Sequence, residues 1–177
     1  MRCFSETLLQ DLGERPVAGS FSNIKTASSQ ARVTIFLSHS HLDHKVVKGL
    51  IRYLDGLGIS IYVDWNDSSM PAVTNRVTAA RLKQRIKACS LFMVLATRNA
   101  LNSKWVPWEV GIADQIKGEN AVSVIGVVDP SGKFPGAEYL QLYQLVAFPD
   151  VGDGARMYTA ETRADGPSFV EYLQRGV

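Results

Sequence analysis

Two short stretches hold the side chains whose types and spacing could do chemistry. The first is SHSHLDH at residues 38–44, which contains all three histidines of the chain. Two histidines at positions i and i+2, followed by an adjacent Asp-His pair, can converge on one zinc ion from a loop. The first chemistry to weigh is therefore metal binding by His39, His41 and His44.

The second stretch is KWVPWEVGIADQI at residues 104–116. At about 100° per residue, helical periodicity predicts that Trp105, Ile112 and Ile116 point to one side. Glu109 falls inside this apolar stripe. A buried carboxylate is costly unless it is paired or used, because burial disfavours its charge. Glu109 is thus either a structural acid that meets a backbone amide or an arginine, or a functional one.

The zinc hypothesis is not supported by the rest of the sequence. The spacing HxHxDH is similar to the zinc motif of metallo-β-lactamases, a family that draws further histidine ligands from later in its fold. This chain has no histidine after His44. The elements that follow also alternate as in a parallel α/β sheet, not as in paired mixed sheets. We therefore expect a polar loop without a metal, placed where ligands bind in such sheets.

Five apolar runs predict the strands that position both stretches, at residues 33–38, 59–64, 90–96, 121–128 and 143–148. Between the strands, apolar residues at three- and four-residue steps predict three helices. The first helix follows the first strand, the second spans the region around 77–86, and the third begins near SKWVPWE. Pro107 is close enough to the start of the third helix to be tolerated. Alternating strands and helices predict an α/β fold with a parallel sheet.

A length of 177 residues fits one domain with tails. We expect residues 1–31 to be an N-terminal extension and linker, with a short helix at 6–12. Residues 13–31 are rich in Gly, Pro and Ser, as linkers are. The domain is expected over 32–148. Residues 149–177 are expected to form a C-terminal extension that ends in a short helix.

Composition excludes several classes of partner. A net charge of +2 with dispersed Lys and Arg argues against an extended nucleic-acid surface. No window is apolar for long enough to cross a membrane, and the N-terminal residues do not resemble a secretion signal. Cys3 and Cys89 provide no disulfide framework. These features predict a cytoplasmic protein with neither nucleic acid nor membrane as a partner.

Four pieces of the sequence occur in the order and at the spacing of a known family. They are IFLSHSHLD, GISIYVD, CSLFMVLATRNALNSKW and WVPWE, of which the last has the pattern WxxxE. Over residues 32–148 the chain resembles a Toll/interleukin-1 receptor (TIR) domain of the type common in bacteria. The resemblance implies a flavodoxin-like, three-layer α/β fold with a five-stranded parallel sheet.

Enzymatic TIR domains cleave NAD+ at the nicotinamide–ribose bond with the glutamate of WxxxE, a role that the resemblance places on Glu109. A carboxylate suits this reaction, because it can hold the ribose hydroxyls and stabilise an oxocarbenium-like transition state. NAD+ is then the substrate, and neither a metal nor another cofactor is needed. The expected substrate-binding residues are His39, Ser40, Asp64, Trp65 and Trp105.

Residues 65–75 are similar to the BB loop of the family, which commonly gates the pocket and joins subunits. We therefore expect self-association through this loop to complete the site. The product is expected to be ADP-ribose or a cyclic ADP-ribose isomer. The chain also resembles the separate TIR proteins of bacterial anti-phage systems such as Thoeris, whose nucleotide signal acts on a second protein.

Two alternatives stay open at this point. A non-catalytic TIR interaction module would bind other TIR domains through its surface, but it gains nothing from a carboxylate in the apolar stripe of a helix. A nucleoside deoxyribosyltransferase-like enzyme has a related fold and also uses a glutamate at a ribosyl centre. An assay of NAD+ against deoxynucleosides separates that enzyme from an NADase.

Overall fold

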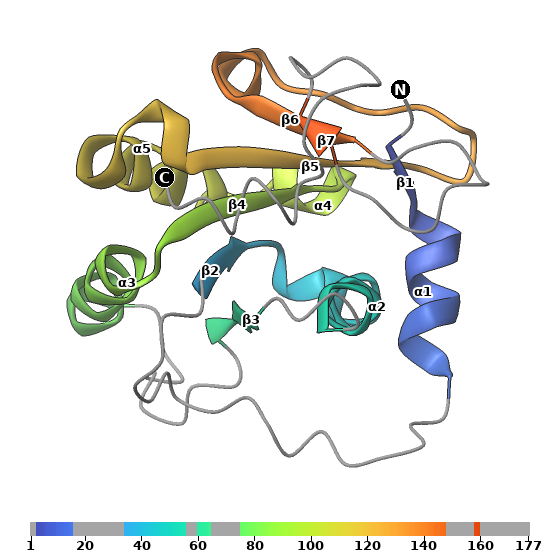
Figure 1. The fold of residues 1–177 in the computed structure, drawn as a ribbon, viewed down its shortest axis with the longest axis horizontal. Coiled ribbons are helices and arrows are strands. Elements are labelled where there is room, and N and C mark those ends of the chain that lie inside the picture. The colour runs from blue at the N-terminus through green and yellow to red at the C-terminus, as the bar shows by residue number, and fades with distance from the viewer. Residues whose placement is uncertain (1–2, 16–33, 56–59, 65–74, 148–157, 160–177) are drawn as a thin grey trace.

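The body of the molecule is a parallel sheet with helices on both faces (Figure 1). The computed structural model describes residues 3–15, 34–55, 60–64, 75–147 and 158–159. The five parallel strands are β2 (Thr34–Ser38), β3 (Ser60–Tyr62), β4 (Leu91–Ala96), β5 (Val122–Val128) and β6 (Gln144–Ala147). Each of them overlaps one of the predicted apolar runs.

The parallel strands lie in the order β3-β2-β4-β5-β6. The first of them in the chain, β2, therefore sits between the second and the third. This is the flavodoxin-like order, and it confirms the expected fold class. In such sheets the direction of winding changes beside the first strand, and ligands bind at the carboxyl edge near this point. Here the change falls between β2 and β4.

Two helical layers cover the sheet. The helices are α1 (Glu6–Glu14), α2 (His44–Asp55), α3 (Arg76–Ala88), α4 (Arg98–Leu101) and α5 (Val106–Lys117). Short 3-10 turns lie at His41–Asp43 (η1), Glu119–Ala121 (η3) and Glu138–Leu142 (η4). Figure 1 shows α1 and α2 on one side of the sheet and α3 and α5 on the other.

Alternation along the strands divides the buried residues into two cores. In β2, Ile35 and Leu37 join the core beneath α1 and α2, whereas Phe36 joins the core beneath α3 and α5. Successive side chains of a strand point to opposite faces, so a strand that is apolar throughout serves both cores. The result is the three-layer arrangement that the resemblance implied.

The N-terminal residues pack tightly on this body. Strand β1 (Phe4–Ser5) pairs in parallel with the end of β5, and α1 lies against α2. A Cβ added at Gly49 would lie 1.9 Å from the carbonyl oxygen of Leu9, so glycine is what allows the two helices to approach. The predicted helix at 6–12 is confirmed. The structure thus joins the first part of the expected extension to the domain.

At the other end, β7 (Tyr158–Thr159) pairs antiparallel with β6 and covers that edge of the sheet. The predicted C-terminal helix, most of the linker at 13–31 and the loop residues 65–74 lie outside the described residues. Among the helices that the structure does describe, none is long and apolar enough to cross a membrane.

Candidate active site

Glu109 lies in the first turn of α5, on the side that faces the sheet. It is only 8% exposed, so its predicted burial is confirmed. The predicted stripe is wrong at Ile116, which is 39% exposed. The helix packs instead through Val106, Val110 and Ala113, whose spacing puts them on the same side as Glu109. The phase of the helix is therefore set by its packing on the sheet.

Among the described residues, the carboxyl group of Glu109 meets one hydroxyl. Ser38, the last residue of β2, donates from Oγ to Oε2 of Glu109 at 2.5 Å, and both side chains are buried. The bond joins residues 71 positions apart. It ties β2 to the first turn of α5 at the carboxyl edge of the sheet.

Burial raises the pKa of Glu109 from its usual range to about 8. The hydrogen bond from Ser38 lowers the pKa, while the negative charge of Asp64 raises it further. No lysine or arginine among the described residues offsets the burial. A buried acid without a cation beside it is not explained as part of a structural ion pair, and strongly shifted acids of this kind gather at functional sites.

His39 and Asp64 complete the group around Glu109. The Nδ1 atom of His39 lies 2.9 Å from the carbonyl oxygen of Leu37, and Nε2 lies 3.7 Å from Oδ1 of Asp64. Because a carbonyl oxygen only accepts, Nδ1 carries the proton. Burial lowers the pKa of His39, although the nearby carbonyl and Asp64 act in the opposite direction. The His39 side chain is 5% exposed and that of Asp64 is 45% exposed.

The other predicted substrate-binding residues have different positions. Ser40 is buried, and its hydroxyl accepts from the backbone N–H of Leu42, so it caps η1. Trp105 immediately precedes α5 and packs edge-on against Trp108, with ring centroids 5.2 Å apart. Both rings pack against the core on the α3 and α5 side. Trp65 lies outside the described residues.

The three histidines of the first motif do not share one environment. The side chain of His39 is buried beside Asp64, whereas His41 and His44 are exposed. Within the described ranges, no three or more His, Cys, Asp or Glu side chains form a group that could hold a metal ion. The expectation of a metal-free loop stays a prediction.

A second buried acid, Asp43, bridges two loops at the carboxyl edge. Its Oδ2 accepts from the hydroxyl of Thr97 at 2.5 Å, and its Oδ1 accepts from the side-chain amide of Asn99 at 2.6 Å. Asp43 follows β2, while Thr97 and Asn99 follow β4. The bridge thus holds together the loops on either side of the place where the winding changes.

Sequence reasoning missed both Ser38 and Asp43 as parts of the site. Ser38 could have been found from strand alternation, because it shares the parity of Phe36 and so points to the α5 side. For Asp43 no comparable signal exists, because its partners lie more than fifty residues away, at separations of 54 and 56.

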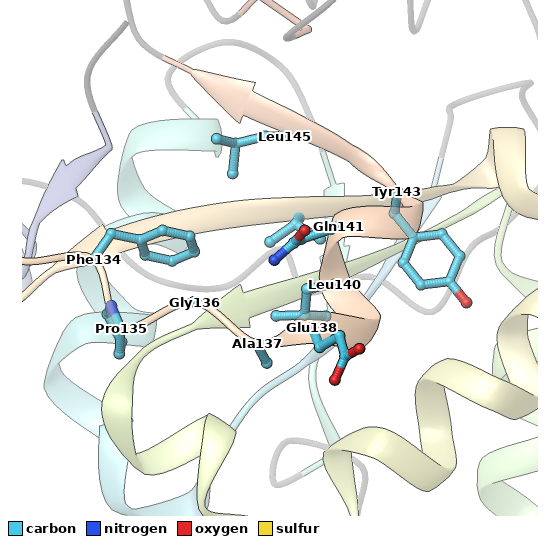
Figure 2. Close-up of a pocket in the computed structure, with 10 residues that line it drawn as sticks. Phe134, Pro135, Gly136, Ala137, Glu138, Leu140, Gln141, Tyr143 and Leu145 are labelled. Atoms are coloured by element: carbon cyan, nitrogen blue, oxygen red, sulfur yellow. The ribbon is translucent and has the colours of Figure 1, made fainter.

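The cavities that described residues line include two of appreciable volume. The larger has a volume of about 600 Å³ and is lined by residues of the loop after β5, of η4 and of β6. Figure 2 shows it with Phe134 and Tyr143 on opposite sides. The smaller, of about 420 Å³, is lined by residues that include Thr97, Arg98 and Asp129. Neither is lined by Glu109, so the chemistry of the side chains, not cavity volume, identifies the site.

The arrangement of strands agrees with the comparisons with known proteins. A family model described as the TIR domain matches residues 35–156. The chain belongs to the TIR-domain family. Glu109 therefore occupies the last position of the WxxxE motif in a genuine TIR fold.

Two curated relatives extend the comparison. A protein of Bacillus cereus (strain MSX-D12), named "Probable 3' cyclic ADP-D-ribose synthase ThsB'", is 37% identical over 115 residues, which make up 64% of this chain and 60% of the relative. A protein of Cytobacillus dafuensis, provisionally named as the cyclic ADP-D-ribose synthase TIR2, is 33% identical over 85 residues. That match covers 46% of this chain and 22% of the relative. The chain thus spans only part of each relative.

Proposed function

We propose that this chain is a TIR-domain NADase, which cleaves the nicotinamide–ribose bond of NAD+ and forms ADP-ribose or a cyclic ADP-ribose isomer. One observation carries the proposal: Glu109 of WxxxE is a buried acid whose contact is a hydroxyl and not a cation. A structural role would call for the arginine or backbone amide that is missing among the described contacts. The names of the two relatives support the same substrate and product class.

The proposed reaction begins with heterolytic cleavage of the bond between C1′ of the ribose and the nicotinamide nitrogen. Both bonding electrons go to the nitrogen, so the cationic ring leaves as neutral nicotinamide and the ribose becomes positively charged. The carboxylate of Glu109 stabilises that charge. Addition of water with loss of a proton gives ADP-ribose. Addition of a nucleophile from the same ADP-ribose unit, with loss of its proton where it carries one, gives a cyclic product.

Ionisation of Glu109 is coupled to substrate binding in this scheme. With a pKa of about 8, the carboxyl group is mostly protonated in the free protein near neutral pH. A bound nicotinamide ring carries a positive charge, which favours the carboxylate and lowers the pKa of Glu109. Asp64 adds a second negative charge nearby, and so attracts the same ring. The acid is therefore activated by the substrate that it acts on.

The remaining site residues are assigned supporting roles. His39 and Asp64 are proposed to contact the dinucleotide from the loops after β2 and β3. Ser40 is proposed to act there through the loop that it caps, and Trp105 through stacking or packing beside the reacting ribose. Trp65 is proposed to line the pocket from the neighbouring loop.

Assembly and signalling form a further part of the proposal. Residues 65–75 are proposed to join subunits and to complete the pocket, as their similarity to the BB loop implies. The nucleotide product is proposed to act in the cytoplasm on a separate effector protein in defence against phage. The support here is the family resemblance together with the product class in the names of the relatives.

Incubation of the purified chain with NAD+, followed by mass spectrometry of the products, tests the proposal. We expect free nicotinamide together with ADP-ribose or with a product lighter by one water. Glu109→Gln keeps the size of the side chain but removes its charge, and should lower turnover by about a hundredfold or more. Glu138→Gln removes an exposed acid on η4 and is the matched control.

Near wild-type cleavage by a folded Glu109→Gln protein would contradict the mechanism. Release of free base from deoxynucleosides, with NAD+ left intact, would favour the deoxyribosyltransferase-like enzyme instead. Absence of both activities across protein concentrations would favour the interaction module.

A further inference from the structure

Ser38 touches Glu109, but no step of the proposed reaction involves it. It is 1% exposed and ends β2, where its partner across the sheet is Val94 of β4. Its hydroxyl therefore stands on a buried residue whose backbone is held by pairing with β4. Close packing around a hydrogen-bonding group placed in this way restricts its movement, so it offers Glu109 a fixed partner.

The hydrogen bond from Ser38 distinguishes the two oxygens of Glu109. It occupies Oε2 at 2.5 Å. Among the described residues, no hydrogen bond occupies the other oxygen, Oε1. A carboxyl group on a flexible side chain would otherwise spend time in rotamers that point neither oxygen at the reacting carbon.

We propose that Ser38 is a positioning residue for the NADase reaction, whose hydroxyl holds Oε2 of Glu109 so that Oε1 faces the ribose. This inference rests on the proposed function and assigns the residue that prepares Glu109 for it. Ser38 acts through Glu109 and does not itself touch the substrate.

A hydroxyl is well suited to this position, because it both donates and accepts. When Glu109 is protonated, Ser38 can accept its proton in a hydrogen bond. When Glu109 is ionised, Ser38 can donate to Oε2. The contact therefore survives the change of charge that accompanies substrate binding, which a carbonyl acceptor would not allow.

The hydrogen bond from Ser38 also affects the ionisation of Glu109, because the groups around Glu109 shift its pKa. Asp64 is the charged group that acts on Glu109, and His39 lies between Asp64 and the backbone of β2. Both burial and Asp64 raise the pKa of Glu109, and the bond from Ser38 opposes them. Loss of the hydroxyl should therefore make Glu109 harder to ionise.

The test compares Ser38→Ala with Ser123→Ala, a matched control. Ser123 is another buried strand serine, in β5, and no hydrogen bond joins it to Glu109 among the described residues. We expect Ser38→Ala to lower kcat for NAD+ cleavage by about ten- to a hundredfold with little change in KM, because a hydrogen bond to a charged group is lost. The acid limb of its pH profile should shift to higher pH. Ser123→Ala should change neither.

Two further variants keep the test decisive. Ser38→Thr retains the hydroxyl on a residue that suits a strand, and should restore kcat and the pH midpoint toward wild type. Ser38→Cys has a weak donor of similar shape, so its kcat and its pH midpoint should lie between those expected for the Ala and Thr variants. This variant keeps the test available even if Ser38→Ala does not fold. A Ser38→Ala or Ser38→Cys protein with wild-type kcat and an unmoved pH midpoint would overturn the positioning role and leave the proposed function standing. No cleavage by the wild-type chain would instead count against the proposed function.

Discussion

The buried carboxyl group of Glu109 makes the stability of the fold depend on pH. Its pKa is about 8 in the folded state and near 4.5 when the chain is unfolded. A raised folded pKa means that the protonated form is favoured by folding. Its contribution is therefore full below about pH 4.5, falls as the pH rises to about 8, and changes little beyond. The shift corresponds to about 5 kcal/mol as an upper bound.

Denaturant unfolding from pH 5 to pH 9 measures this effect, with Glu109→Gln as the reference. We expect the wild-type chain to lose free energy of unfolding relative to Glu109→Gln by a few kcal/mol across this range. The difference between the two proteins isolates Glu109, because His39 and the other groups titrate in both. A difference that stays constant with pH would mean that Glu109 ionises near its ordinary pKa.

The pH dependence of turnover should be set by the ionisation of Glu109. The pH dependence of kcat/KM reports the free protein, so its acid limb should have a midpoint near the pKa of about 8 for Glu109. The profile of kcat should have its midpoint at lower pH, because the bound cationic ring favours the carboxylate. Steady-state rates at saturating and at low NAD+ separate the two. Coinciding midpoints would exclude the coupling of ionisation to binding.

The hydrogen bonds from Thr97 and Asn99 to Asp43 hold the loop of His39 against the loop after β4. Asp43→Ala removes two hydrogen bonds and leaves the buried hydroxyl of Thr97 with one partner fewer, which should cost about 2–3 kcal/mol. Asp55→Ala, at the exposed end of α2, should change stability by less than about 0.5 kcal/mol. Urea unfolding of the three proteins checks this, and equal stability of all three would show that the bridge contributes nothing.

The contact between α1 and α2 depends on glycine. An alanine at Gly49 would place its Cβ against the Leu9 carbonyl, so Gly49→Ala should destabilise the chain by about 1–3 kcal/mol and loosen α1. Gly111→Ala is the matched control on α5, where an added Cβ meets nothing within 4 Å. That control should stabilise the helix by up to about 1 kcal/mol. Denaturant unfolding and hydrogen exchange of α1 provide the measurement, and protection of α1 in Gly49→Ala equal to wild type would contradict the close contact.

The same elements show what the sequence could predict. The five parallel strands were predictable because each is a continuous apolar run between turn residues, as in Leu91–Ala96. The two-residue strands β1 and β7 were not, because pairing of Phe4 with Val127 or Tyr158 with Ala147 leaves no local periodicity. The residues of the candidate site likewise include some that the sequence could predict and some that it could not. Glu109 was visible from its motif and its helix, and Ser38 from strand alternation, whereas Asp43 is fixed by contacts far along the chain.

The proposed assembly of several chains implies that one chain alone holds an incomplete site. Cleavage per chain is expected to rise with protein concentration if self-association through residues 65–75 completes the pocket. Turnover is measured across a wide dilution series while light scattering follows the size of the assembly. A strictly monomeric protein with constant turnover would show that the site is complete within one chain. Shortening of 65–75 to a tight turn should abolish cleavage and spare the fold.

The acid at the centre of the site also bears on how this molecule can change over evolutionary time. Since burial of Glu109 opposes folding near and above neutral pH, substitutions that replace it with a neutral side chain should yield a protein that tolerates heat better. On the proposed function, a lineage that no longer needs cleavage gains stability by losing this residue early. Descendants without Glu109 should then be more stable than the present chain, and a retained glutamate would mark selection for the proposed reaction.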